Sequence, residues 1–110
     1  MSARERRKGA SGELEVVHLL QAAGWLGAKR TSDGREQLLR GDIAGGPKST
    51  YIEVRRRETA SVWAWHEEAS RQAQPGHVPL VFFRRSRSPW LALVSVDELL
   101  PLLALREREG

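Results

Sequence analysis

Two acidic residues and one basic residue stand on neighbouring predicted strands, at a spacing that suits metal-dependent chemistry. Asp42 lies on the first strand, and Glu53 and Arg55 lie on the second. If the hairpin is symmetric about the turn-forming residues 46–49, Asp42 is opposite Glu53, with Cβ atoms roughly 5 Å apart. One divalent cation can bridge two carboxylates at that separation. The pattern predicts a metal-dependent phosphodiesterase, and the alternative is an ordinary cross-strand cluster of ion pairs.

A third acid, Glu13, stands on the apolar side of an expected helix. We predict that this helix begins at Ser11 or Gly12 and ends at Ala23. Its apolar stripe consists of Val16, Val17, Leu20 and Ala23. Glu13 precedes Val16 by three residues and therefore extends this stripe. It is either a first-turn acid favoured by the helix dipole or a carboxylate directed at the site of the other two acids.

The chain is basic, and its arginines occur in clusters. Its 110 residues include 18 Lys and Arg against 14 Asp and Glu, which gives a formal net charge of +4. Clustered arginine favours a phosphate-rich partner such as a nucleic acid, although solvated surface charge is the alternative. The basic candidates for DNA contacts are Arg6, Arg7, Lys8, Arg30, Arg56, Arg57, Arg84, Arg85 and Arg87. The chain shows no recognition-helix signature, so we expect selectivity for DNA shape.

Composition excludes several other classes of protein. The chain has no cysteine, which rules out a disulfide framework and cysteine-zinc sites and fits a reducing cytoplasm. Its three histidines have no metal-ligand spacing. No apolar run approaches the roughly 20 residues of a membrane span, and the charged first residues lack the apolar segment of a signal peptide. We expect a cytoplasmic protein without a membrane partner.

The expected fold is α/β, a mixed sheet of about five strands flanked by about three helices, in the order α-β-β-β-α-β-β-α. Residues 1–9 are predicted to be a basic flexible arm, and residues 10–106 a single domain. The expected strands span 28–32, 38–44, 49–57, 78–83 and 90–94. The second helix runs from Thr59 or Ser61 to about Gln74, and a leucine-rich third helix follows Ser95. Trp63 and Trp65 on the second helix either stack on unpaired bases or belong to the core or a dimer interface.

The order of these motifs resembles the PD-(D/E)xK nuclease superfamily, and within it the archaeal-type Holliday-junction resolvases and their phage relatives. Residues 8–15 are similar to the basic Lys-Gly segment and catalytic Glu with which those resolvases begin. Residues 41–43, Gly-Asp-Ile, resemble the family's Pro-Asp-Ile, with Gly in place of Pro. Residues 52–55, Ile-Glu-Val-Arg, resemble its apolar-Glu-x-Lys strand, with Arg in place of Lys. The likeness extends over roughly residues 8–104.

The resemblance implies a restriction-endonuclease-like fold and a homodimer that makes paired nicks in four-way DNA junctions. By the same resemblance, Glu13, Asp42 and Glu53 are ligands of Mg²⁺, which Mn²⁺ can replace, and the Val54 carbonyl completes the set. Ser32 lies near the position of a functional serine and joins the candidate DNA contacts. Arg55 replaces the family's lysine; it cannot act as a general base, but it can hold the scissile phosphate. The alternatives are a binder of branched DNA that does not cut, and a nuclease acting on ordinary duplex.

Overall fold

Three helices and five strands follow one another along the chain in the predicted order. The computed structural model describes residues 3–33 and 41–110. The elements are α1 (Ala3–Ala22), β1 (Lys29–Arg30), the short 3₁₀ helix η1 (Thr31–Asp33), β2 (Ile43–Ala44), β3 (Thr50–Arg56), α2 (Val62–Gln72), β4 (Val78–Arg84), β5 (Leu91–Leu93) and α3 (Val96–Glu109). The α/β class and the mixed five-stranded sheet are therefore confirmed. The predicted strand 38–44 is observed only as β2, and its residues 38–40 lie outside the described residues.

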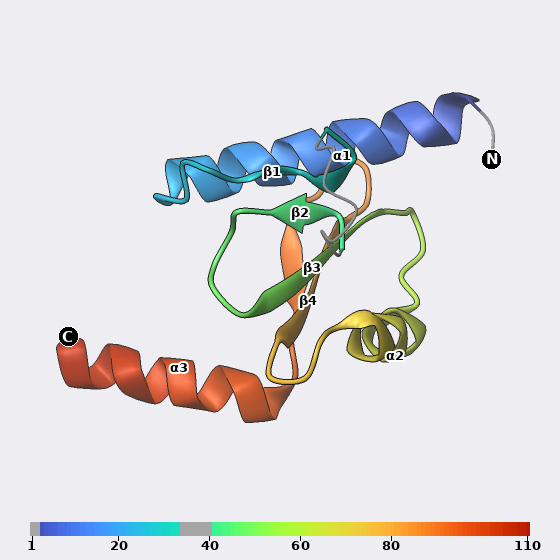
Figure 1. The fold of residues 1–110 in the computed structure, drawn as a ribbon. Coiled ribbons are helices and arrows are strands. Elements are labelled where there is room, and N and C mark those ends of the chain that lie inside the picture. Colours follow the sequence, from blue (N-terminus) through green and yellow to red (C-terminus); the bar gives the residue numbers. More distant parts are fainter. Residues whose placement is uncertain (1–2, 34–40) are drawn as a thin grey trace.

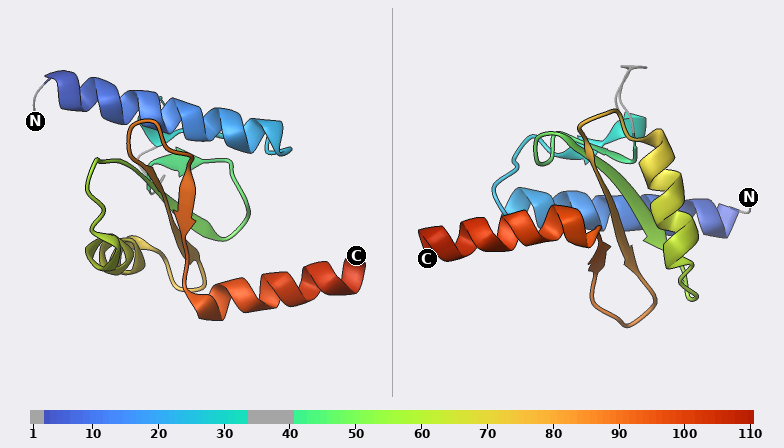
Figure 2. Two further views of the ribbon diagram at one scale, coloured as in Figure 1. Left: turned by 180° about the vertical axis from the view of Figure 1, so that it is seen from behind. Right: turned by 90° about the horizontal axis from the view of Figure 1, so that it is seen from below.

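The sheet is mixed because one of its strand pairs is parallel. Its order is β1-β2-β3-β4-β5; β3 and β4 run parallel, and the other neighbours are antiparallel. A parallel pair needs a long crossover connection, and α2 supplies it between β3 and β4. Helix α1 lies along one side of the sheet and α2 lies on the other (Figures 1 and 2). The central strand β3 therefore has a helix on each face.

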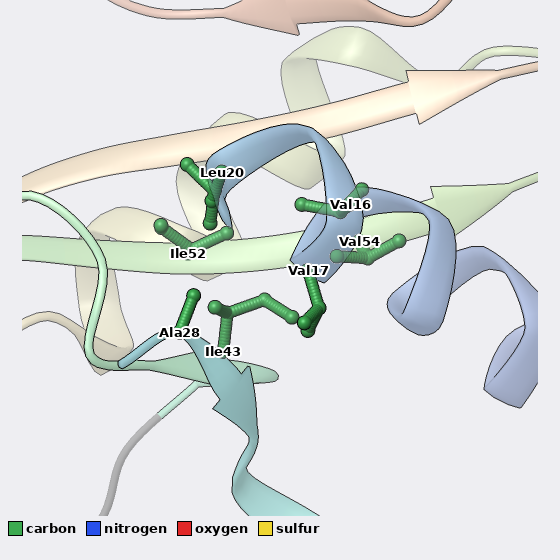
Figure 3. Packing of buried hydrophobic residues seen from close by; sticks show 7 residues of the cluster. All are labelled: Val16, Val17, Leu20, Ala28, Ile43, Ile52 and Val54. Carbon is green, nitrogen blue, oxygen red and sulfur yellow. The ribbon is translucent and has the colours of Figure 1, made fainter. Parts of the chain in front are cut away.

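The larger core lies between α1 and the sheet. Successive side chains of a strand point to opposite faces, so Ile52 and Val54 of β3 both face α1. They pack against Val16, Val17 and Leu20 of the stripe predicted on α1 (Figure 3), whereas Ala23 lies beyond the helix and is exposed. The buried residues of this core are Val16, Val17, Leu20, Ala28, Ile43, Ile52 and Val54. The alternation leaves Glu53 and Arg55 on the opposite face of β3, as the sequence predicts.

A smaller core lies on the α2 side of the sheet, and only one of the two tryptophans of that helix belongs to it. Ala69 of α2 packs with Tyr51 and Val81, and Trp65 packs beside them. The Trp65 ring meets the Phe83 ring edge-on, with centroids 5.4 Å apart. Trp63, in contrast, is 81% exposed. Trp65 therefore belongs to the core, whereas Trp63 is available on the surface.

Helix α1 begins earlier than predicted. It starts at Ala3, so residues 3–9 of the expected flexible arm form its first turns, and the predicted start at residue 11 or 12 is wrong. The residues from Ala3 to Lys8 all have high helix propensity, and this outweighs the glycines that follow. Gly12 has a packing role, because a Cβ there would lie 2.6 Å from Cγ of Arg56 on β3. Glycine thus permits the close contact between α1 and the sheet.

Helix α3 leaves the sheet after β5 and contains no buried residue. It continues through Pro101 as one helix from Val96 to Glu109. Figures 1 and 2 show it extending away from the other described elements. Among the described helices, none combines the length and the apolar composition that crossing a bilayer requires.

Candidate functional site

Asp42 is held against β3 by its backbone. Its N–H donates to the Ile52 carbonyl at 2.7 Å, and its own carbonyl accepts from the Thr31 N–H at 3.0 Å. Ile43 pairs with Ile52, which is the register of the predicted hairpin. The preceding Gly41 has φ +75°, and a Cβ on it would lie 2.7 Å from the Ile52 carbonyl oxygen. Proline cannot adopt that φ, so glycine is required for this approach to β3.

The Asp42 and Glu53 carboxylates share the Arg55 guanidinium. Arg55 Nη1 lies 3.0 Å from Glu53 Oε2 and 3.7 Å from Asp42 Oδ2. Asp42 Oδ2 also accepts a hydrogen bond from the Val54 N–H at 2.8 Å. Arg55 Nη1 donates to the Val54 carbonyl at 3.2 Å as well. The structure thus brings together the three residues that the hairpin pattern predicts, with the arginine as their common cation.

Tyr51 is a member of the cluster that the sequence analysis does not include. Its hydroxyl donates to Glu53 Oε1, the carboxylate oxygen that Arg55 does not contact. Burial, followed by the hydrogen bond to Glu53, raises the pKa of Tyr51 above its ordinary value. Tyr51 precedes Glu53 by two residues, and this strand periodicity was the signal that could have identified it. The tyrosine thus orients the Glu53 carboxylate by a hydrogen bond to one of its two oxygens.

The carboxyl of Asp42 is perturbed. Burial raises its pKa from 3.8 to about 7; the negative charges of Glu53 and Glu13 and a hydrogen bond to Glu53 add to the rise, and the Val54 N–H opposes it. Burial is the largest cause, so this environment disfavours the charged form of the Asp42 carboxyl. Such a carboxyl takes up a proton near neutral pH, or it favours the arrival of a further cation.

Glu13 faces the same region from α1 but has its own partner. Its Oε1 accepts from Nε of Arg30 on β1 at 3.0 Å, and each side chain is 20% exposed. Its charge still contributes to the raised pKa of Asp42. Of the two interpretations offered for Glu13, the structure favours a carboxylate directed at the common site.

A surface cavity of about 390 Å³ lies over these groups. Its wall includes Glu13, Asp42, Val54 and Arg55. The remaining lining residues come mostly from the predicted DNA contacts and the start of α1: Arg6, Gly9, Ala10, Arg30, Ser32 and Arg57. An acidic centre with a basic margin is suited to a phosphodiester, because the margin can bind the backbone while the centre acts on one phosphate.

A second cavity of about 350 Å³ adjoins the first through Arg57, which lines both. Arg84, Arg85 and Ser88 also contribute to its wall, together with the apolar side chain of Phe83. The basic lining therefore continues from the acidic cavity toward the turn between β4 and β5.

Two of the predicted DNA contacts have structural partners instead. Glu15 on α1 accepts from Nη1 of Arg56 at 3.3 Å and from Nη2 of Arg84 at 2.8 Å. Trp90 Nε1 donates to the same carboxylate at 3.3 Å, and its ring lies under the Arg84 guanidinium. The side chains of Arg56 and Arg84 are only 13% and 18% exposed. Both arginines therefore help to join α1 to the sheet, a role for which no local sequence pattern gives a signal.

Among the remaining basic candidates, Arg30 is the partner of Glu13, and most of the others are exposed. Lys8 pairs with Glu58, its Nζ 3.4 Å from the carboxylate. Arg7 at the start of α1 is exposed, as are Arg85 and Arg87 in the turn after β4. Arg87 has φ +59°, so it occupies a left-handed position of that turn.

The donor atoms of the cluster suit a hard divalent cation, but the arginine stands among them. Asp42, Glu53 and the Val54 carbonyl offer oxygen ligands of the kind that Mg²⁺ binds. Within residues 3–33 and 41–110, no group of three His, Cys, Asp or Glu side chains has the spacing of a metal site. Arg55 contacts all three oxygen donors, so a metal ion would have to displace at least part of these contacts.

Comparison with protein-family models, with curated proteins and with solved structures gives no match for this chain.

Proposed function

We propose that the protein is a metal-dependent endonuclease with a restriction-endonuclease-like fold that cuts branched DNA, as Holliday-junction resolvases do. One observation carries the proposal: Asp42, Arg55 and Glu13 line a cavity with a basic margin, and Glu53 is ion-paired with Arg55. These residues stand in the order in which the PD-(D/E)xK pattern places its functional groups. Ordinary ion pairing explains the contacts of Arg55 with Glu53 and of Arg30 with Glu13, but it does not explain why Asp42, with its pKa raised to about 7, lies half-buried at the same cavity.

The acidic residues would hold the cation. Asp42 and Glu53 would bind Mg²⁺, or Mn²⁺ in its place, with the Val54 carbonyl as a further ligand and Glu13 joining directly or through water. When bound, the cation lowers the pKa of a coordinated water and neutralises charge that develops on the phosphate. Tyr51 keeps Glu53 oriented through its hydroxyl.

Arg55 would bind the phosphate that is cut. Its guanidinium stays protonated, so it stabilises negative charge and accepts no proton. In the structure its Nη1 donates hydrogen bonds to Glu53 Oε2 and to the Val54 carbonyl. If Asp42 and Glu53 held a cation, the Arg55 guanidinium would be free to bind the DNA phosphate.

The basic margin would hold the neighbouring phosphates. Arg6, Arg30 and Arg57 line the acidic cavity, and Arg57 with Arg85 continues into the adjoining one. Contacts with phosphates carry no base information, so they favour recognition of DNA shape. A homodimer would then place two equal sites on a four-way junction and give paired nicks.

A second candidate function is the binding of branched DNA without cleavage. The observation that favours it is the position of Arg55 among the oxygen donors, where it already neutralises part of their charge. A third candidate, a nuclease acting on ordinary duplex, requires the same residues and differs only in substrate.

The test is incubation of the purified protein with an end-labelled four-way junction and with a linear duplex of the same sequence, in Mg²⁺ and in EDTA. Paired nicks in the junction alone, and only with metal, support the proposal. Junction binding without cutting in Mg²⁺ or Mn²⁺ moves the protein to the second candidate. Equal cutting of both substrates leaves a nuclease without junction selectivity.

A further inference from the structure

The C-terminal helix α3 carries an apolar surface that no other described element covers. Residues 99–105 read Leu-Leu-Pro-Leu-Leu-Ala-Leu without interruption. None of the residues of α3 is buried, although five of them are leucines. The exposed fractions are 37% for Leu99, 56% for Leu100, 61% for Leu102, 45% for Leu103 and 44% for Leu105. Helices that are apolar over most of their circumference are normally buried, so this surface calls for a partner.

We propose that α3 pairs with α3 of a second copy of the chain, antiparallel and about a two-fold axis at Leu102. At 3.6 residues per turn, Leu99, Leu102, Leu103 and Arg106 share one side of the helix, and Glu98 stands one turn before Leu102. The proposal gives an interface to the homodimer of the proposed function, but it is independent of the nuclease activity, because no residue of the acidic cluster enters it.

The positions of the charges select this arrangement. Glu98 and Arg106 are each four residues from Leu102, in opposite directions. In an antiparallel pair centred on Leu102, Glu98 of each copy therefore meets Arg106 of the other, about 6 Å along the helix from the axis. Leucines fill the region between these two ion pairs. A two-fold interface must be complementary to itself, and this helix fulfils that condition.

Other arrangements lose this match. A parallel pair would place Glu98 against Glu98 and Arg106 against Arg106, and like charges brought together oppose association. Binding of an unrelated protein does not require opposite charges at equal distances on either side of the centre of α3. The self-complementary pattern therefore favours a second copy as the occupant.

The first experiment measures the molar mass of the full chain by sedimentation over a range of concentrations. We expect a wild-type dimer, a monomer for Leu102→Asp, and an unchanged dimer for Leu26→Asp, a matched control at a leucine that is 80% exposed and lies before β1. Far-ultraviolet circular dichroism checks that each variant retains its fold. A wild-type monomer at every concentration, or a dimer unaffected by Leu102→Asp, overturns the proposal.

The second experiment tests the antiparallel pairing through the charges. Glu98→Arg alone and Arg106→Glu alone should each weaken self-association about tenfold or more, because like charges then face each other twice. An equimolar mixture should form heterodimers with the wild-type affinity, since both contacts are again between opposite charges. If the mixture associates no better than its components, or if α3 instead binds anionic lipid vesicles while the protein stays monomeric, the proposal is wrong.

Discussion

Replacing Asp42 with Asn should raise the free energy of unfolding at pH 8 relative to the wild type, because the acidic cluster disfavours a charged carboxylate at this position. Burial and the neighbouring acids raise the pKa of Asp42 from 3.8 to about 7 in the folded protein. The folded state therefore binds a proton more tightly than the unfolded chain does. The contribution of this group is fully present below about pH 4 and is lost as the pH rises through about 7.

The size of the effect follows from the two pKa values. The difference between 3.8 and about 7 corresponds to about 4 kcal/mol at 1.36 kcal/mol per pH unit. Asn carries no charge, and its side-chain oxygen can still accept the hydrogen bond from the Val54 N–H. The variant should therefore match the wild type near pH 4 and exceed its free energy of unfolding at pH 8, by up to about 4 kcal/mol.

The assay is urea unfolding of both proteins from pH 4 to pH 8, followed by circular dichroism. The quantity of interest is the difference between the two free energies, since titrating groups that do not interact with Asp42 contribute equally to both. Glu67→Gln, at an exposed position of α2, serves as the control and should show no such trend. A difference that stays constant with pH, or that falls as the pH rises, would refute the reasoning about the cluster.

Magnesium extends the same test. A cation that binds only the folded protein stabilises it by about 2.7 kcal/mol at one hundred times its Kd. We expect Mg²⁺ to raise the midpoint of wild-type unfolding at pH 8 and to leave that of Asp42→Asn unchanged. Equal stabilisation of both proteins would place the cation elsewhere.

Three further predictions concern other parts of the molecule. Glu15→Gln should lower the free energy of unfolding in urea by about 2 kcal/mol, because Arg56 and Arg84 lose their charged partner; an unchanged midpoint would mean that the ion pairs add nothing. Gly45→Ala should destabilise strongly, since φ is +74° and the new Cβ would lie 2.2 Å from the Gly27 carbonyl oxygen, whereas an equal melting temperature would disprove this constraint. Arg57→Gln should weaken junction binding and reduce the slope of log affinity against log salt by about 1, and an unchanged slope would remove Arg57 from the DNA contact.

The sequence was most informative where local rules decide the structure. Turn-forming residues and strand alternation predicted the hairpin register, so Ile43 opposite Ile52 and the convergence of Asp42 with Glu53 were foreseeable. The helical spacing of Val16, Val17 and Leu20 likewise predicted the side of α1 that packs on the sheet.

The features that the sequence did not predict depend on contacts between residues that are far apart in the chain. Glu15 meets arginines 41 and 69 residues away and a tryptophan 75 residues away, which no local pattern encodes. The early start of α1 was missed because its first turns carry charged residues without an apolar stripe and were expected to form a flexible arm, whereas the structure continues the helix back to Ala3. The leucines of α3 suggested an ordinary packed helix, and only the fold reveals that no described element covers them.

The most direct test of the central claim measures junction cleavage and junction binding on the same preparations of wild type, Asp42→Asn, Glu53→Gln and the control Glu67→Gln. We predict metal-dependent nicks with the wild type and the control. We predict no nicks with the two cluster variants, whose affinity for the junction should stay close to that of the wild type. Cleavage that survives in both cluster variants, or that is absent from the wild type in Mg²⁺ and in Mn²⁺ alike, would contradict the assignment of the acidic cluster as the centre that cuts DNA.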